Sequence, residues 1–87
     1  MTEHNPELWN FPCTIALKVV GDAHEQFENE VIMAVQSVKP GDYRSKSMPS
    51  KNGKFVSITV PVLVTNIDEV QALFAAARRV AGVHIVL

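Results

Sequence analysis

The segment Phe55–Val64 limits the folds open to this chain most strongly, because its apolar residues recur at every second position. These alternating positions are Val56, Ile58, Val60, Val62 and Val64. Successive side chains of a β-strand point to opposite faces, so this period of two predicts a strand with one buried face. Two helical patterns and three weaker strand patterns in the rest of the chain supply apolar stripes that can cover or extend that face.

A strand followed by a helix is predicted ahead of this segment. From Cys13 to Val20 the residues alternate again, and the predicted core-facing set is Cys13, Ile15, Leu17 and Val19. Asp22, with Glu25 three residues later, resembles a capping box and predicts that the helix starts there. Proline cannot continue a helix, so Pro40 is predicted to end it. The helical core-facing positions are Phe27, Val31, Ala34, Val35 and Val38.

A hairpin is predicted to join an edge strand to the Phe55–Val64 strand. The residues from Tyr43 to Pro49 are more polar and include basic side chains, as is typical of the edge of a sheet. The predicted turn is Ser50-Lys51-Asn52-Gly53, because its Asn-Gly pair readily accepts positive φ and favours a hairpin into Phe55. Pro61 lacks the N–H that a sheet ladder uses, so we predict a bulge or an unpaired side of the strand there.

A second helix and a short final strand complete the pattern. Asn66 and Glu69 supply an N-cap side chain and an acid in the first turn, and Gly82 is predicted to be the C′ residue that ends the helix. The helical core-facing positions are Ile67, Val70, Leu73, Phe74, Ala77 and Val80. In the final strand Val83, Ile85 and Leu87 alternate with His84 and Val86.

The order strand, helix, strand, strand, helix, strand predicts the α+β class, as a ferredoxin-like βαββαβ two-layer sandwich. We expect an antiparallel sheet in the order 4-1-3-2 with both helices on one face. Residues 1–10 are predicted to be a flexible segment, in which Leu8 and Trp9 favour packing against the domain, and residues 11–87 to be a single ferredoxin-like domain. The open face is predicted to carry Thr14, Ala16, Lys18, Val20, Phe55, Ser57, Thr59, Leu63, His84 and Val86.

The composition disfavours some classes of partner but does not identify a particular one. Lys plus Arg (8) nearly balance Asp plus Glu (9), so the net charge favours neither polyanions nor polycations. Basic residues gather between Lys39 and Lys54 and acidic residues between Asp22 and Glu30, which favours self-association through opposite patches. The single cysteine, Cys13, excludes an intrachain disulfide. Without a secretory pattern or an apolar run of about 20 residues, we expect a cytoplasmic protein with no membrane contact.

Several short motifs resemble a known family. They are Phe11-Pro12, Lys18-Val19-Val20-Gly21, Pro40-Gly41-Asp42-Tyr43, Pro49-Ser50 with Gly53, Ser57-Ile58-Thr59 and Ile85-Val86-Leu87. From Phe11 to the end, with the same spacing, the chain resembles the small bacterial YbeD-like proteins. That resemblance implies a ferredoxin-like domain of uncharacterised function, similar in shape to the ACT regulatory domains that bind amino acids in metabolic enzymes. It implies no catalytic residues, and Pro61 departs from the family's more usual strand residue.

Other activities hosted by this fold lack the residues that they need. A soft-metal carrier would place a Cys-x-x-Cys loop between the first strand and the first helix, where this chain has Val20-Gly21-Asp22-Ala23. An acylphosphatase-like enzyme would need an anion-binding loop at the same place, and Asp22 would repel an anion. The histidines follow no metal-ligand spacing, and Cys13 has no activating neighbour in sequence. We therefore expect no catalytic residues, no metal and no cofactor.

The prediction from sequence is a non-enzymatic binding domain with a regulatory or adaptor role, acting through protein–protein contacts of its sheet. The expected partner is another protein or a second copy in a dimer. One alternative is an ACT-like sensor of a small-molecule effector such as an amino acid. Another is weak RNA binding, which is disfavoured because Phe55 is the only ring predicted on the open faces of the two central strands. The candidate ligand or partner surface comprises Gly21, Asp22, Gly41, Asp42, Tyr43 and Phe55.

Overall fold

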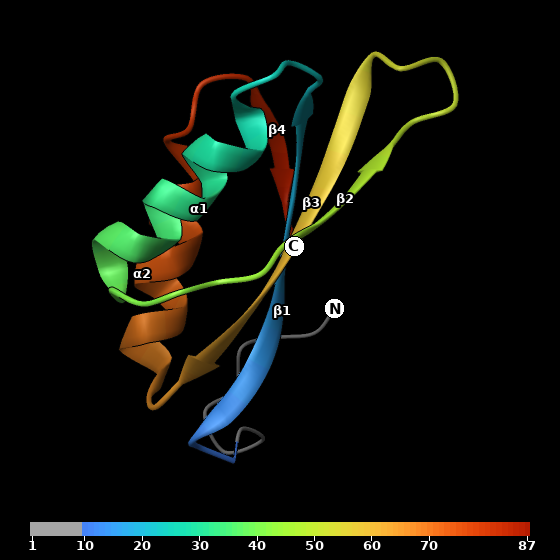
Figure 1. Cartoon of the computed structure of the whole chain (residues 1–87). Helices are drawn as coiled ribbons and strands as arrows, with labels where there is room; N and C mark the ends of the chain where they lie inside the picture. Colours follow the sequence, from blue (N-terminus) through green and yellow to red (C-terminus); the bar gives the residue numbers. More distant parts are fainter. Residues whose placement is uncertain (1–9) are drawn as a thin grey trace.

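The computed structural model describes residues 10–87, which form four strands and two helices in the predicted order (Figure 1). The elements are β1 (Cys13–Asp22), α1 (Phe27–Val38), β2 (Lys46–Pro49), β3 (Phe55–Val64), α2 (Ile67–Arg78) and β4 (Val83–Val86). Residues 1–9 lie outside the described part, so the flexible segment 1–10 and the packing of Leu8 and Trp9 stay predictions. Neither helix of the described region combines the length and the apolar character that crossing a membrane requires.

The four strands form one antiparallel sheet in the order β2-β3-β1-β4, which confirms the predicted order. All ten residues of β1 lie opposite residues of β3, from the pair Cys13 and Val64 to the pair Asp22 and Phe55. Figure 1 shows α1 and α2 side by side on one face of the sheet, while the other face has no covering layer among the described residues. The ferredoxin-like arrangement is therefore present.

The core lies between the helices and the covered face of the sheet, and the predicted alternation of β1 and β3 supplies half of it. In β3 the buried positions are every second residue from Ile58 to Val64, and in β1 Leu17 and Val19 are fully buried. Cys13 and Ile15, on the same side of β1, are partly buried. The core cluster is Leu17, Val19, Phe27, Val31, Val35, Ile58, Val60, Val62, Val64, Val70, Leu73 and Ala77.

Pro61 lies within β3, and its missing N–H costs the sheet no hydrogen bond. Lys18 and Leu87 exchange both backbone hydrogen bonds, so the backbone of Lys18 points toward β4, and alternation turns that of Ala16 the same way. Ala16 lies opposite Pro61, so the backbone nitrogen of Pro61 points away from β1. On that side the paired region of β2 reaches no further than the Lys46–Thr59 pair. The predicted unpaired side is confirmed, and the register between β1 and β3 has no bulge at this point.

The predicted start of the first helix at Asp22 is wrong. β1 continues through Asp22, because this residue pairs with Phe55 and its N–H donates to the carbonyl of Gly82 at 3.0 Å. The helix begins at Phe27, and its N-cap residue Gln26 makes no side-chain capping bond. A pairing with residues far along the chain has overridden a local capping signal.

Two other predicted boundaries also shift. The edge strand begins at Lys46 instead of Tyr43, whose hydroxyl donates to the carbonyl of Lys39 at 2.7 Å and so holds it beside the end of α1. The second helix ends at Arg78 with Arg79 as its C-cap, so Gly82 is not the C′ residue. Gly82 instead has φ +87° in the next turn, where the N–H of Val83 donates to the carbonyl of Val80.

The predicted faces of the last strand are wrong, because the pairing of β4 with β1 contains a bulge. Val86 lies opposite the buried Val19 and packs against the core, whereas Ile85 lies opposite Val20 and is 51% exposed. The register shifts between Val20 and Gly21, so that Gly21 lies opposite Val83 and not opposite His84. His84 is the extra residue of the bulge, so Ile85 takes the place on the open face that was predicted for Val86.

Gly21 is required because two groups approach it closely. A Cβ atom added there would lie 2.4 Å from Cζ of Phe27 and 2.7 Å from the carbonyl oxygen of Gly82. The same carbonyl accepts the bond from Asp22, so it is not free to move away. We expect Gly21→Ala to lower the free energy of unfolding by about 1–3 kcal/mol, the usual cost of overpacking.

Urea denaturation would measure this change. The matched control is Thr14→Ala at an exposed position of the same strand, with an expected change within about 0.5 kcal/mol. A Gly21→Ala variant as stable as this control would contradict the close approach.

Candidate functional site

The open face of the sheet, the side turned away from α1 and α2, carries most of the exposed apolar surface of the described residues. Residues opposite one another in an antiparallel register share a face, and the pairs are Thr14 with Leu63, Lys18 with Thr59, Val20 with Ser57, Asp22 with Phe55, Lys46 with Thr59, Met48 with Ser57 and Ile85 with Val20. The exposed large apolar side chains on this face are Met48 at 72%, Leu87 at 60%, Leu63 at 54%, Ile85 at 51% and Phe55 at 39%. Only Met33 of α1, at 65%, is comparable elsewhere between residues 10 and 87.

Three adjacent hollows form a shallow groove along this face beside β2. The first, of about 220 Å³, is lined by Lys18, Met48 and Phe55 among others, and the second, of about 260 Å³, shares Lys18 and Met48 with it. The third, of about 430 Å³, shares Lys46 with the second and extends to Pro61. We call this feature the β2 groove, lined by Lys18, Val20, Arg44, Ser45, Lys46, Ser47, Met48, Pro49, Ser50, Phe55, Val56, Ser57, Thr59 and Pro61.

The ionised side chains that line the β2 groove are all cationic. They are Lys18 from β1, Lys46 from β2 and Arg44 from the segment before β2. No Asp or Glu lines any of the three hollows. The groove therefore combines apolar contact surface at Met48 and Phe55 with positive charge, which suits carboxylates attached to an apolar segment.

A small polar cluster lies where β1, β3 and β4 meet at one end of the open face. Nε2 of His84 and Oδ1 of Asp22 are 2.7 Å apart, and the rings of Phe55 and His84 contact edge to face with centroids 5.3 Å apart. The side chains of Asp22 and His84 are 58% and 50% exposed. The pairing of β1 with β3 and the bulge of β4 bring these three residues together.

The predicted site residues divide into two groups. Asp22 and Phe55 are direct partners on the open face, as described. Gly21 is buried within β1 and not in a turn, and the ring of Phe27 and the carbonyl of Gly82 fill the space beside its Cα. The segment that contains Gly41, Asp42 and Tyr43 instead closes the end of α1.

The end of α1 is closed by hydrogen bonds to this segment. Gln36 donates to the carbonyl of Gly41 at 3.0 Å, and Tyr43 binds the carbonyl of Lys39. Asp42 is exposed in the same segment. These contacts support a structural role for Gly41 and Tyr43.

Sequence reasoning missed Lys46, Met48, Ile85 and Leu87 as residues of the open face. Lys46 and Met48 could have been assigned by continuing the hairpin pairing outward from the Asn-Gly turn, which places Met48 opposite Ser57 and Lys46 opposite Thr59. Ile85 and Leu87 carried no such signal, because their orientation depends on the bulge.

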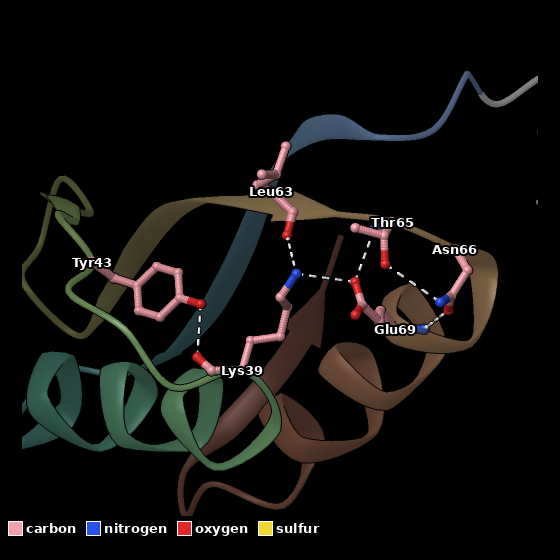
Figure 2. Close-up of polar contacts among 6 residues, drawn as sticks. All are labelled: Lys39, Tyr43, Leu63, Thr65, Asn66 and Glu69. Carbon is pink, nitrogen blue, oxygen red and sulfur yellow. Dashed lines mark hydrogen bonds and ion pairs between the residues drawn. The ribbon is translucent and has the colours of Figure 1, made fainter.

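A polar network ties the end of α1 to β3 and to the start of α2, and Figure 2 shows it. Nζ of Lys39 donates to the carbonyl of Leu63 at 2.7 Å and to Oε1 of Glu69 at 3.1 Å. The same carboxylate oxygen accepts from the N–H of Thr65 at 2.8 Å, and Oδ1 of Asn66 accepts from the N–H of Glu69 at 2.9 Å. The predicted N-cap of the second helix is therefore confirmed.

Glu69 is held in its ionised form by this network. The backbone N–H of Thr65, and then the ammonium of Lys39, lower the pKa of Glu69 from its usual value. The partners of this carboxylate are Lys39 at the end of α1 and Thr65 directly after β3, so the network holds both helices to the sheet. Within residues 10–87, no three His, Cys, Asp or Glu side chains gather as a metal site would require.

Comparison with known proteins assigns the family. Residues 6–87 match the family model described as "Protein of unknown function (DUF493)". The chain belongs to the DUF493 family. UPF0250 proteins of Shewanella putrefaciens and Shewanella oneidensis are 42% and 41% identical to it over 81 residues, which cover 93% of this chain and 92% of each relative. The resemblance to YbeD-like bacterial proteins is confirmed.

Solved structures confirm the fold of this DUF493 member. Protein HP0495 from H. pylori is similar over 99% of this chain and 98% of its own, with a TM-score of 0.77 and 20% identity. The ACT domain from GTP pyrophosphokinase of Chlorobium tepidum is similar over 85% of this chain and 94% of its own, with a TM-score of 0.62 and 17% identity. At these identities the similarity establishes a shared ferredoxin-like, ACT-like fold.

We expect Glu69→Gln to lower the melting temperature near neutral pH and to flatten its dependence on acid pH. A carboxyl whose pKa is lowered by folding stabilises the protein above its unfolded-state pKa, about 4.3, and this contribution is lost as the pH falls through the folded-state value. The wild type should therefore lose more stability on acidification than the variant. Circular dichroism melts from about pH 7 to about pH 3, spanning the carboxyl range, would measure both effects.

The matched control is Asp68→Asn, which removes an exposed carboxylate from the same first turn of α2. Its acid dependence should follow that of the wild type more closely than that of Glu69→Gln. Equal acid dependence for Glu69→Gln and the wild type would contradict the role given to the network.

Proposed function

We propose that this chain is a non-enzymatic binding domain with a regulatory or adaptor role, and that it docks another protein on the open face of its sheet. One observation carries the proposal: five of the six exposed large apolar side chains of residues 10–87 share the open face with the cationic β2 groove. Large apolar residues clustered on one face, beside polar ones, are typical of a protein interaction site.

Charge indicates the chemistry of the partner. Lys18, Arg44 and Lys46 follow the groove beside the apolar Met48. A segment that presents apolar side chains together with Asp or Glu would bury the apolar surface and place its carboxylates near these cations. We therefore propose an acidic, partly apolar protein segment as the occupant of the β2 groove.

The sensor alternative has the ACT-like fold in its favour and the local packing against it. A small effector held by the turn after β1 would need space beside Gly21, and Phe27 and the carbonyl of Gly82 take up that space. The turn is therefore a weaker candidate than the open face for a binding role. Weak RNA binding has one ring in its support, because Phe55 is the one aromatic residue of β1 and β3.

The test compares variants of exposed methionines on opposite sides of the molecule. Met48→Ser removes apolar surface from the groove, and Met33→Ser removes a similarly exposed methionine from α1. With the tagged full chain as bait in extract of the native cells, we expect a partner that Met33→Ser retains and Met48→Ser loses. Binding of that purified partner should weaken with added salt and on changing Lys18 or Lys46 to Ala.

Three results would overturn the proposal. They are equal capture by both methionine variants, a purified partner whose binding does not respond to salt, and a partner whose bound segment lacks acidic residues. A thermal shift with amino acids would support the sensor alternative instead. Salt-sensitive RNA binding that Phe55→Ala weakens would support the RNA alternative.

A further inference from the structure

The three cations of the β2 groove have no ionic partner among residues 10–87. Lys18, Arg44 and Lys46 are all exposed, and the ion pairs that join described residues lie elsewhere, at the end of α1 and at the far end of β1. The hollow at Arg44 and Pro61 is the largest of the three that form the groove, at about 430 Å³. This end of the groove is therefore available to an acidic occupant.

An exposed apolar strip joins this hollow to the start of β1. Leu63 is 54% exposed on the open face opposite Thr14, and Pro61 comes next on the same face, opposite Ala16. Lys18 belongs to the pair after that. Successive pairs on one face are about 7 Å apart, twice the rise per residue of a strand. A segment that runs back from the start of β1 along the open face would thus meet apolar surface first and positive charge next.

The nine residues before Asn10 carry complementary groups in the same order. Counting back from Asn10, Trp9 comes first, and Glu7 and Glu3 follow, with no Lys or Arg among the nine. In an extended segment alternate side chains share one side, so these three residues would face the same surface. Pro6 favours an extended conformation, because proline fixes its own φ and restricts the residue before it.

The segment is also long enough for this path. Nine residues span up to about 30 Å when extended. Lys18 lies five residues along β1 from Cys13, or about 17 Å, and Lys46 is two strands across, about 10 Å further. Since Arg44 and Pro61 are nearer to the start of β1 than Lys46 is, the segment can turn onto the open face and still reach the hollow.

We propose that residues 1–9 fold back along the open face of the same molecule and occupy the end of the β2 groove. The indole of Trp9 then covers Leu63, and the carboxylates of the segment lie beside Arg44 and Lys46. The occupant is acidic and partly apolar, which is the chemistry proposed above for a partner. The chain thus carries its own competitor for the groove, and only this competition rests on the proposed function.

Fluorescence of Trp9 tests the contact, because the sequence contains one tryptophan. We expect acrylamide to quench Trp9 of the full chain at least about twofold more weakly than Trp9 of a free peptide of residues 1–10, since packing removes a large part of the indole from water. Added salt should raise the quenching towards the value of the peptide, because salt screens exposed ion pairs. Dilution should leave the quenching unchanged, since the contact lies within one molecule.

Charge reversal tests where the segment lies. The variant Glu3→Lys with Glu7→Lys should raise the quenching constant of Trp9 by about twofold, and Arg44→Glu with Lys46→Glu should do the same, because each places like charges together. All four substitutions in one chain should restore the protection of the wild type, since the ion pairs form again with their signs exchanged. A merely structural effect of either double variant would not be rescued in this way.

The matched controls reverse a charge outside the contact. Glu25→Lys and Lys51→Glu change exposed residues that line none of the three hollows, so both should leave the quenching of Trp9 unchanged. Circular dichroism would verify that every variant is folded.

Partner capture tests the competition separately. With the tag placed after Leu87, the Glu3→Lys, Glu7→Lys variant should bind the partner that Met48→Ser loses about threefold more tightly than the wild type does, because a covered groove lowers the apparent affinity by the fraction that is uncovered. Equal binding by the two chains would reject the competition.

The proposal fails if Trp9 is quenched equally in the full chain and in the peptide, or if the chain with all four reversals stays unprotected. Protection that increases with protein concentration would contradict it as well, because the occupant would then come from a second copy. Protected Trp9 without any partner that depends on Met48 would reject the docking proposal and leave the contact standing. The two proposals therefore fail on different results.

Discussion

The structure depends on the ten-residue antiparallel register between β1 and β3. Side chains alternate between the two faces of a strand, so a slip of one residue would move the buried valines of β3 into solvent and bring Thr59 and Leu63 under the helices. Burial of Leu17 and Val19 opposite Val60 and Ile58 favours the observed register. The positions of both helices and of both edge strands follow from this pair, because β2 pairs with β3 and β4 pairs with β1.

The contacts that hold the helices and those offered to solvent lie on opposite sides of this register. On the covered side the core is apolar, and Lys39, Glu69 and Asn66 join the helices to β3 at the rim. On the open side no second layer covers the sheet within the described chain, so its apolar residues stay exposed. In a two-layer architecture one face of the sheet thus lies outside the core, so its residues need not be apolar.

The fold could be predicted because its determinants are local in sequence. The alternation of Phe55–Val64, the cap at Asn66 and the turn at Gly53 each act within a few residues, and all three appear in the structure. The wrong predictions concern residues whose pairing partners are distant in sequence. Asp22 carried a capping signal, but a strand pairing with Phe55 and the carbonyl of Gly82 prevailed. For the candidate site, Asp22 and Phe55 were identified and do meet, whereas Ile85 was assigned to the wrong face because alternation does not reveal a bulge.

Pro61 also affects the hollow that it lines at the end of the β2 groove. If the pairing of β2 with β3 continued beyond Lys46 and Thr59, Arg44 would lie opposite Pro61 and would fill the space beside it. The ring nitrogen of Pro61 has no hydrogen and faces that side, so such a pair would lack one of the two backbone bonds that it normally forms. Pro61 therefore weakens the pairing that would close the hollow beside Arg44.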